Sequence, residues 1–160
     1  MSNPFREELV SGARPEACTV VILGATGDLT HRKLVPALYN LAAEGELPPG
    51  VKIVGMARRD WSDEYFRDSL EKINRGVSRS GHSDELWAQF RGCISYHASE
   101  FQDGAGYRAL SKRLDEIDRE RGGNGNRLFY LACAPEFFDD ILTQLREAGL
   151  SAEQEGRWSR

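Results

Sequence analysis

The chain has little of what marks exported, membrane-spanning or nucleic-acid-binding proteins. Its 160 residues include three cysteines, Cys18, Cys93 and Cys133, too few and too scattered for a disulfide framework or a zinc site. No apolar run approaches the roughly 18 residues of a membrane helix, and no signal-peptide core opens the chain. The net charge of -4 leaves no electrostatic footprint for nucleic acid. We therefore expect a protein of the reducing cytoplasm that binds neither membrane nor nucleic acid and holds no metal.

The composition is that of one ordinary globular domain, with 40% hydrophobic and 29% charged residues. Residues 1–17, rich in Glu, Arg, Gly and Pro, are predicted to form a flexible leader. The folded domain is expected over residues 18–150. The polar residues 151–160 are expected to form a tail that supplies no strand and leads to a missing one.

Apolar runs alternate with helical patterns along the chain. Strands are predicted at 19–23, 51–56, 93–97 and 128–133, with helices near 33–44, 62–77, 84–90, 107–121 and 135–148. This order predicts a Rossmann-like, doubly wound parallel α/β sheet with strand order 3-2-1-4. The fourth strand is apolar on both faces, as interior strands are, so we expect the sheet to be incomplete and the chain to be the front part of a longer protein.

Capping residues and apolar stripes give the expected helices their ends and faces. Ser62 is expected to cap its helix, Gly122-Gly123 to stop the helix before them, and Gly149 to end the last one. Pro36 fits only near a helix start, so regular helix is expected from about Lys33. The buried faces of two helices are predicted to be Phe66, Leu70, Ile73 and Val77, and Phe138, Ile141, Leu142 and Leu145.

The most informative feature is the run from Thr19 to Leu29, where an apolar strand ends in a Gly-x-x-Gly turn before a helix. Unpaired backbone N–H groups and the positive end of the helix dipole converge there, and a phosphate can bind. A side chain at Gly24 or Gly27 would hold a pyrophosphate away from the backbone. Asp28 is expected to cap the helix rather than to take part in chemistry. The run therefore predicts a dinucleotide phosphate loop.

The second predicted strand ends in Ala57-Arg58-Arg59, where a domain that prefers NAD carries Asp or Glu. A carboxylate would repel the 2′-phosphate of NADP, whereas a guanidinium can bind it with two hydrogen bonds. Thr26 could add a hydroxyl donor. This position therefore favours NADP as the cofactor, with two solvated arginines as the alternative interpretation.

The chain offers no convincing catalytic base. His31, His82 and His97 fall on a helix turn, a polar connection and a strand end, where we expect surface residues. A short-chain reductase would need a Tyr-x-x-x-Lys pair, and none of the five tyrosines has a lysine four residues later.

Three blocks of sequence resemble the glucose-6-phosphate dehydrogenase family. They are Gly24-Ala-Thr-Gly-Asp-Leu-Thr-His-Arg-Lys-Leu-Val-Pro-Ala-Leu-Tyr39, Ile53-Val-Gly-Met-Ala-Arg58 and Asn126-Arg-Leu-Phe-Tyr-Leu-Ala-Cys-Ala-Pro135. Their spacing also agrees, so the resemblance covers about residues 18–150. It implies NADP-dependent oxidation of glucose 6-phosphate to a lactone in the pentose phosphate pathway, by a protein that forms homo-oligomers.

The resemblance also implies roles for individual residues. The pyrophosphate would be held by Gly24, Ala25, Thr26, Gly27, Asp28, Leu29 and Thr30, and the 2′-phosphate by Arg58 with Thr26. Arg59 would flank the adenine, and Ala132, Cys133 and Phe138 the nicotinamide half. Lys33 matches a family lysine near the sugar phosphate, although a lysine in a first helical turn is as easily a solvated side chain.

The family's Glu-Lys-Pro-Phe-Gly segment and its Arg-Ile-Asp-His-Tyr-Leu-Gly-Lys motif, which supplies the histidine base, are expected after Arg160. The resemblance therefore implies that this chain has no catalytic residue of its own and is inactive alone. The alternative is a non-catalytic nucleotide-sensing or interaction module that has kept the phosphate loop and lost the enzymatic activity.

Overall fold

The computed structural model describes residues 15–121 and 125–160. Most of the predicted leader and the glycine pair predicted to stop a helix at 122–123 lie outside these residues. Among the helices described, none is both long and apolar enough to cross a membrane.

The predicted doubly wound parallel sheet is confirmed, with the strand order β3-β2-β1-β4. The strands are β1 (Thr19–Leu23), β2 (Lys52–Ala57), β3 (Ile94–Ala98) and β4 (Arg127–Leu131). The helices are η1 (Thr30–Leu34), α1 (Val35–Ala43), α2 (Asp63–Val77), α3 (Asp84–Arg91), α4 (Gly104–Arg121), η2 (Pro135–Phe137) and α5 (Phe138–Glu147).

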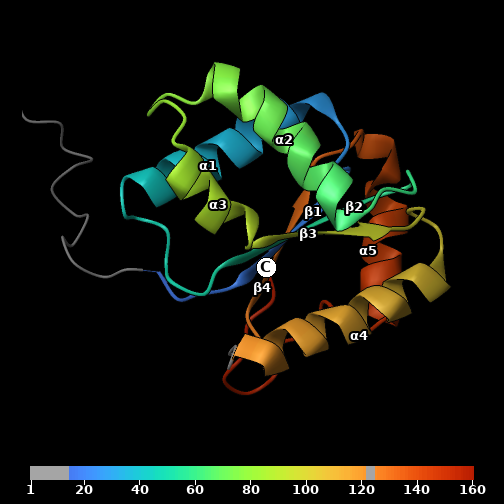
Figure 1. Ribbon diagram of the computed structural model, residues 1–160. Coiled ribbons are helices and arrows are strands. Elements are labelled where there is room, and N and C mark those ends of the chain that lie inside the picture. Colours follow the sequence, from blue (N-terminus) through green and yellow to red (C-terminus); the bar gives the residue numbers. More distant parts are fainter. Residues whose placement is uncertain (1–14, 122–124) are drawn as a thin grey trace, which may run out of the picture.

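Two layers of helices cover the two faces of the sheet. The helices α1, α2 and α3 lie on one face, and α4 and α5 lie on the other (Figure 1). Successive side chains of a strand point to opposite faces. Val20 and Ile22 of β1 therefore join the core under the first three helices, while Val21 and Leu23 join the core with α4 and α5.

Two helix faces differ from the predicted stripes. On α2, Phe66 and Leu70 are fully buried, but Val77, the last residue of the helix, is 44% exposed. On α5, Ile141 and Leu145 are buried, whereas Leu142 is 54% exposed.

The helix after β1 begins earlier than predicted and has a widened turn. Helical backbone starts at 28–29 and continues as the π-helical η1, in which the N–H of Val35 donates to the carbonyl of Thr30. Pro36 follows in the first turn of α1. Because proline has no N–H, it cannot complete an ordinary turn with Arg32, and the wider turn accommodates it. Regular α-helix therefore begins at Val35, two residues after the predicted start near Lys33, and the π-helical turn before it was not predicted.

Residues 151–160 supply no fifth strand, as predicted, but the tail pairs with β4 through an isolated bridge that the sequence analysis did not foresee. The N–H of Arg127 donates to Trp158 O at 3.0 Å, and the N–H of Phe129 donates to Arg160 O at 2.7 Å. The N–H of Arg160 donates in return to Arg127 O, and Ser159 pairs with Arg127 in parallel. Main-chain pairing needs no apolar side chains, and an edge strand offers free N–H and C=O groups. The tail therefore covers part of the β4 edge.

The end of the predicted leader is also part of the fold. Glu16 Oε2 accepts hydrogen bonds from Trp158 Nε1 at 2.9 Å and from Asn126 Nδ2 at 3.1 Å. The side-chain oxygen of Asn126 in turn accepts the N–H of Trp158 at 3.0 Å. These bonds fix the tail against the start of β4 and make Glu16, which was predicted to belong to the leader, part of the fold.

Candidate nucleotide-binding site

A cavity of about 350 Å³ lies at the carboxyl ends of the strands. The loops after all four strands contribute to it, because the carboxyl ends of parallel strands share one edge of the sheet. It is lined by Gly24, Thr26, Gly27, Ala57, Arg58, Ser99, Glu100, Phe101, Gln102, Ala132, Cys133 and Phe137. The phosphate loop and the first arginine after β2 are therefore brought together, as the sequence predicted.

The phosphate loop is fixed to β2 and lies close to the loop after β4. The N–H groups of Gly24 and Ala25 both donate to Met56 O, at 2.9 and 3.1 Å. Gly24 has φ +95°, and a Cβ there would overlap the carbonyl of Ala132. Only glycine adopts this conformation and allows this approach without strain.

Close packing beneath the loop depends on Gly55 of β2. Ala25 is fully buried, and a Cβ added to Gly55 would lie 2.8 Å from the Cβ of Ala25. The same Cβ would lie 2.5 Å from Cζ of Phe66, which is also fully buried. The missing side chain of Gly55 therefore lets the loop and α2 pack directly on β2.

His31 connects the loop to α2. Its Nδ1 lies 3.0 Å from Gly27 O, and its Nε2 lies 3.1 Å from Ser69 Oγ. The hydroxyl of Ser69 donates to Phe66 O at 2.7 Å. His31 is only 7% exposed, so this link runs through the interior of the domain and holds the Gly27 carbonyl.

The remaining predicted loop residues differ in exposure. Leu29 is 43% exposed, whereas Thr30 is fully buried and therefore offers no hydroxyl to a ligand in the cavity. Asp28, predicted as a cap, instead pairs with Arg32, its Oδ1 lying 2.7 Å from Arg32 Nε. The first N–H groups of a helix that starts at 28 have no carbonyl one turn earlier to bind, and they stay available to an anion.

Of the predicted basic residues, Arg58 alone lines the cavity. The guanidinium of Arg59 lies over the ring of Trp61, 5.5 Å from its centroid, and Lys33 is exposed without being part of the lining. Glu100 contributes a carboxylate on the side of β3.

On the β4 side, Ala132 and Cys133 line the cavity as predicted, but the adjacent phenylalanine differs. Phe137 lines it in place of the predicted Phe138, and its ring lies 5.3 Å from that of Phe101. Burial raises the pKa of the Cys133 thiol, so it stays protonated at neutral pH.

Sequence reasoning missed the residues after β3. Ser99 to Gln102 all line the cavity. Their position directly after a predicted strand was the available signal, because all parallel strands of one sheet end at the same edge.

The side chains of His31 and His82 are buried, contrary to prediction, and none of the three histidines lines this cavity. The side chain of His82 is 8% exposed. His97 is half-buried, with Nε2 2.9 Å from Gly106 O, and desolvation is the main cause that lowers its pKa.

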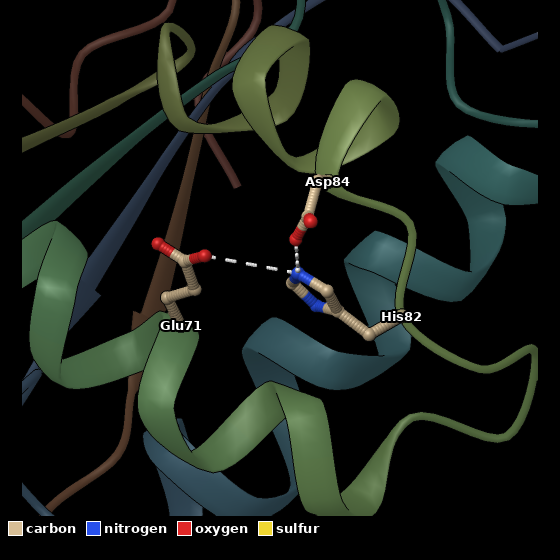
Figure 2. A group of neighbouring side chains, drawn as sticks. All are labelled: Glu71, His82 and Asp84. Atoms are coloured by element: carbon tan, nitrogen blue, oxygen red, sulfur yellow. Dashed lines mark ion pairs between the residues drawn. The ribbon is translucent and has the colours of Figure 1, made fainter.

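A second polar cluster lies between α2 and the start of α3 (Figure 2). His82 Nε2 lies 3.3 Å from Asp84 Oδ1 and 3.7 Å from Glu71 Oε1. The guanidinium of Arg75 donates to both of these carboxylate oxygens at 2.7 Å. Because Arg75 already occupies the place that a metal cation would take, the cluster is an ion-pair network that joins two helices.

The chain matches known proteins across nearly its whole length. The family model for the NAD-binding domain of glucose-6-phosphate dehydrogenase matches residues 21–160. Glucose-6-phosphate 1-dehydrogenase of Chlamydia pneumoniae is 42% identical over 166 aligned residues, which cover 100% of this chain and 32% of that protein. The Bacillus subtilis protein of the same name is 35% identical, with 92% and 28% covered.

Solved structures agree. One described as glucose-6-phosphate dehydrogenase in complex with its substrate glucose-6-phosphate matches with a TM-score of 0.79 and 34% identity, over 91% of this chain and 29% of that one. The enzyme from Mycobacterium avium matches with a TM-score of 0.74 and 25% identity, over 89% and 29%. The chain thus spans less than a third of the length of these relatives. It belongs to the glucose-6-phosphate dehydrogenase family and corresponds to the domain of that family that binds a nicotinamide dinucleotide.

Proposed function

We propose that the chain binds NADP and serves a glucose-6-phosphate dehydrogenase, which oxidises glucose 6-phosphate at C1 to the lactone while NADP becomes NADPH. The observation that carries the proposal is the single cavity shared by the phosphate loop and Arg58. An anion bound at Gly24 and Gly27 would correspond to the pyrophosphate of the coenzyme, and a second anion bound at Arg58 to the 2′-phosphate, which NADP has and NAD lacks.

The backbone of the phosphate loop would bind the pyrophosphate. Gly24, Thr26 and Gly27 leave room for close approach, and the helix that starts at 28 adds the positive end of its dipole. The residues Ala25, Asp28, Leu29 and Thr30 would shape this loop. Ala25 and Thr30 are buried and act by packing.

The 2′-phosphate would be bound by Arg58, assisted by the hydroxyl of Thr26. Arg58 is exposed in the structure and lines the cavity, so its guanidinium is free to meet a charged ligand. Arg59, already stacked on Trp61, would remain at the margin of the adenine site.

The coenzyme would take up the hydride, and this chain would bind and orient it. Ala132, Cys133 and Phe137 line the end of the cavity next to β4, where the nicotinamide half would lie. We place the proton-accepting base and most substrate ligands outside this chain, with Lys33 as a residue near the sugar phosphate. The three free cysteines of the described residues support a reducing compartment such as the cytoplasm, and we expect a homo-oligomeric protein.

The test compares Arg58→Ala with the matched variant Arg59→Ala by titration calorimetry with NADP and NAD. Arg58→Ala should weaken NADP binding by about 1.5–3 kcal/mol, the value of a hydrogen bond to a charged group, and leave NAD binding nearly unchanged. Arg59→Ala should change both affinities little. Equal losses of NADP and NAD affinity in Arg58→Ala would contradict the assignment.

A further inference from the structure

Tyr96 of β3 lies beneath the loop that carries Arg58. Its hydroxyl is 3.0 Å from Ala57 O and 2.7 Å from Arg59 O, the carbonyl oxygens of the residues on either side of Arg58. We infer that Tyr96 is a positioning residue, which holds the backbone at Arg58 so that its side chain points into the cavity and thereby favours NADP over NAD. The inference rests on the function proposed for Arg58.

Each of the two carbonyl oxygens also accepts a hydrogen bond from a backbone N–H group. Ala57 O also accepts the N–H of Ser99 at 2.9 Å, and Arg59 O also accepts the N–H of Trp61 at 3.0 Å. Arg58 itself is exposed. The buried hydroxyl of Tyr96 therefore connects Ala57 and Arg59, the two residues that flank the exposed Arg58.

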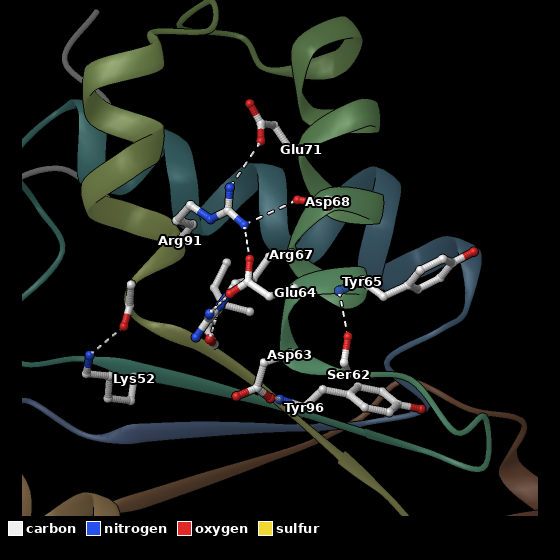
Figure 3. Close-up of polar contacts among 12 residues, drawn as sticks. Lys52, Ser62, Asp63, Glu64, Tyr65, Arg67, Asp68, Glu71, Arg91 and Tyr96 are labelled. Atoms are coloured by element: carbon white, nitrogen blue, oxygen red, sulfur yellow. Dashed lines mark hydrogen bonds and ion pairs between the residues drawn. The ribbon is translucent and has the colours of Figure 1, made fainter.

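Tyr96 is itself fixed by its neighbours (Figure 3). Its N–H donates to Asp63 Oδ1 at 2.6 Å, and Asp63 also accepts two hydrogen bonds from Arg113 at 3.0 Å. Its ring lies 5.1 Å from that of Phe66, and Tyr96 as a whole is 3% exposed. Because Tyr96 is fixed in β3, its hydroxyl also fixes the position of the loop at Arg58 relative to the sheet.

The Tyr96 hydroxyl also keeps its proton under ordinary conditions. Desolvation by burial raises its pKa to about 12, opposed by the charge of Arg59 and assisted by that of Asp60. The hydroxyl therefore donates to the carbonyl groups throughout the pH range in which coenzyme binding would be measured.

The test removes only the hydroxyl. Tyr96→Phe keeps the ring contacts, so the fold should remain, and calorimetric titrations with NADP and NAD report the effect. We expect the Kd for NADP to rise about three- to tenfold, as for the loss of one hydrogen bond, while the Kd for NAD stays within about twofold. A structural role alone would lower stability without changing the ratio of the two affinities.

Tyr39→Phe is the matched control. Tyr39 is fully buried, and its hydroxyl accepts the N–H of Ser83 at 2.9 Å, remote from the cavity lining. Tyr39→Phe should lose about as much stability as Tyr96→Phe and keep its affinities for NADP and NAD.

The double variant Tyr96→Phe/Arg58→Ala separates the positioning role of Tyr96 from the function proposed for Arg58. If Tyr96 acts through Arg58, Tyr96→Phe should have no further effect on NADP binding once Arg58 is gone. Equal weakening of NADP and NAD, or no change in either, would overturn the positioning role while Arg58 keeps its own. A normal NADP affinity in Arg58→Ala alone would refute the proposed function and this inference with it.

Discussion

Gly55→Ala tests whether the phosphate loop is supported by direct packing on β2. The added methyl group would lie 2.5 Å from Phe66 Cζ and 2.8 Å from Ala25 Cβ, both closer than Cβ atoms approach in real structures. Neither neighbour can yield easily. Phe66 is fully buried among the rings of His31, Trp61 and Tyr96, and Ala25 belongs to a loop fixed by two hydrogen bonds to Met56 O.

Two effects of opposite sign determine how Gly55→Ala changes the free energy of unfolding. Replacing glycine by alanine stabilises a compatible backbone by about 0.4–1 kcal/mol through the unfolded state. Inserting a methyl group into a filled core costs about 1–3 kcal/mol. We expect a net loss of about 1–2 kcal/mol, together with weaker binding of both NADP and NAD because the loop must move.

Urea denaturation and coenzyme titration measure the two consequences. Gly76→Ala in α2 is the control, since a Cβ there would meet nothing within 4 Å. It should stabilise the protein by up to about 1 kcal/mol, as alanine does in a helix. Phe66→Leu combined with Gly55→Ala should recover part of the loss. If Gly55→Ala were as stable as the control variant and bound both coenzymes normally, the packing argument would be refuted.

Two further predictions concern the loop and pH. Gly27→Val should abolish binding of both coenzymes and leave the fold intact, because the new side chain starts 3.2 Å from Gly24 O in the loop itself; normal NADP affinity in calorimetry would show that the phosphate lies elsewhere. The lowered pKa of His97 in the folded state means that the unfolded chain binds the proton more readily, so its contribution to stability is present above its ordinary pKa of about 6.5 and lost as pH falls below it. Urea melts at neutral and mildly acidic pH should show this loss in the wild type and a smaller one in His97→Gln; equal slopes would refute it.

The features that local sequence determines were predicted well. The strand order follows from the alternation of apolar runs with helical patterns, and the tight turn after β1 follows from Gly24, whose positive φ only glycine adopts readily. The cap at Ser62, whose Oγ accepts the N–H of Tyr65, and the helix end at Gly149 were likewise confirmed. The cap and the helix end depend on residues within a few positions of one another, and the strand order follows from the order of elements along the chain and the handedness of parallel crossovers.

The features that depend on the whole fold were not predicted. Phe137 rather than Phe138 faces the cavity because a single 3₁₀ turn precedes α5, and periodicity cannot detect that shift of one residue. The lining role of Ser99 to Gln102 depends on where β3 lies in the sheet. Burial of His31 arises from its contact with Ser69 on α2, 38 residues away in sequence.

The pairing of the tail with β4 also fixes the direction in which the backbone of the tail runs. Ser159 lies opposite Arg127 in parallel, so a backbone that continued in this register would lie opposite Leu131 four residues further on. At about 3.3 Å per residue, that point is level with the end of β4, beside the Ala132 and Cys133 wall of the cavity. The tail therefore runs toward the same edge of the sheet at which the candidate cavity lies.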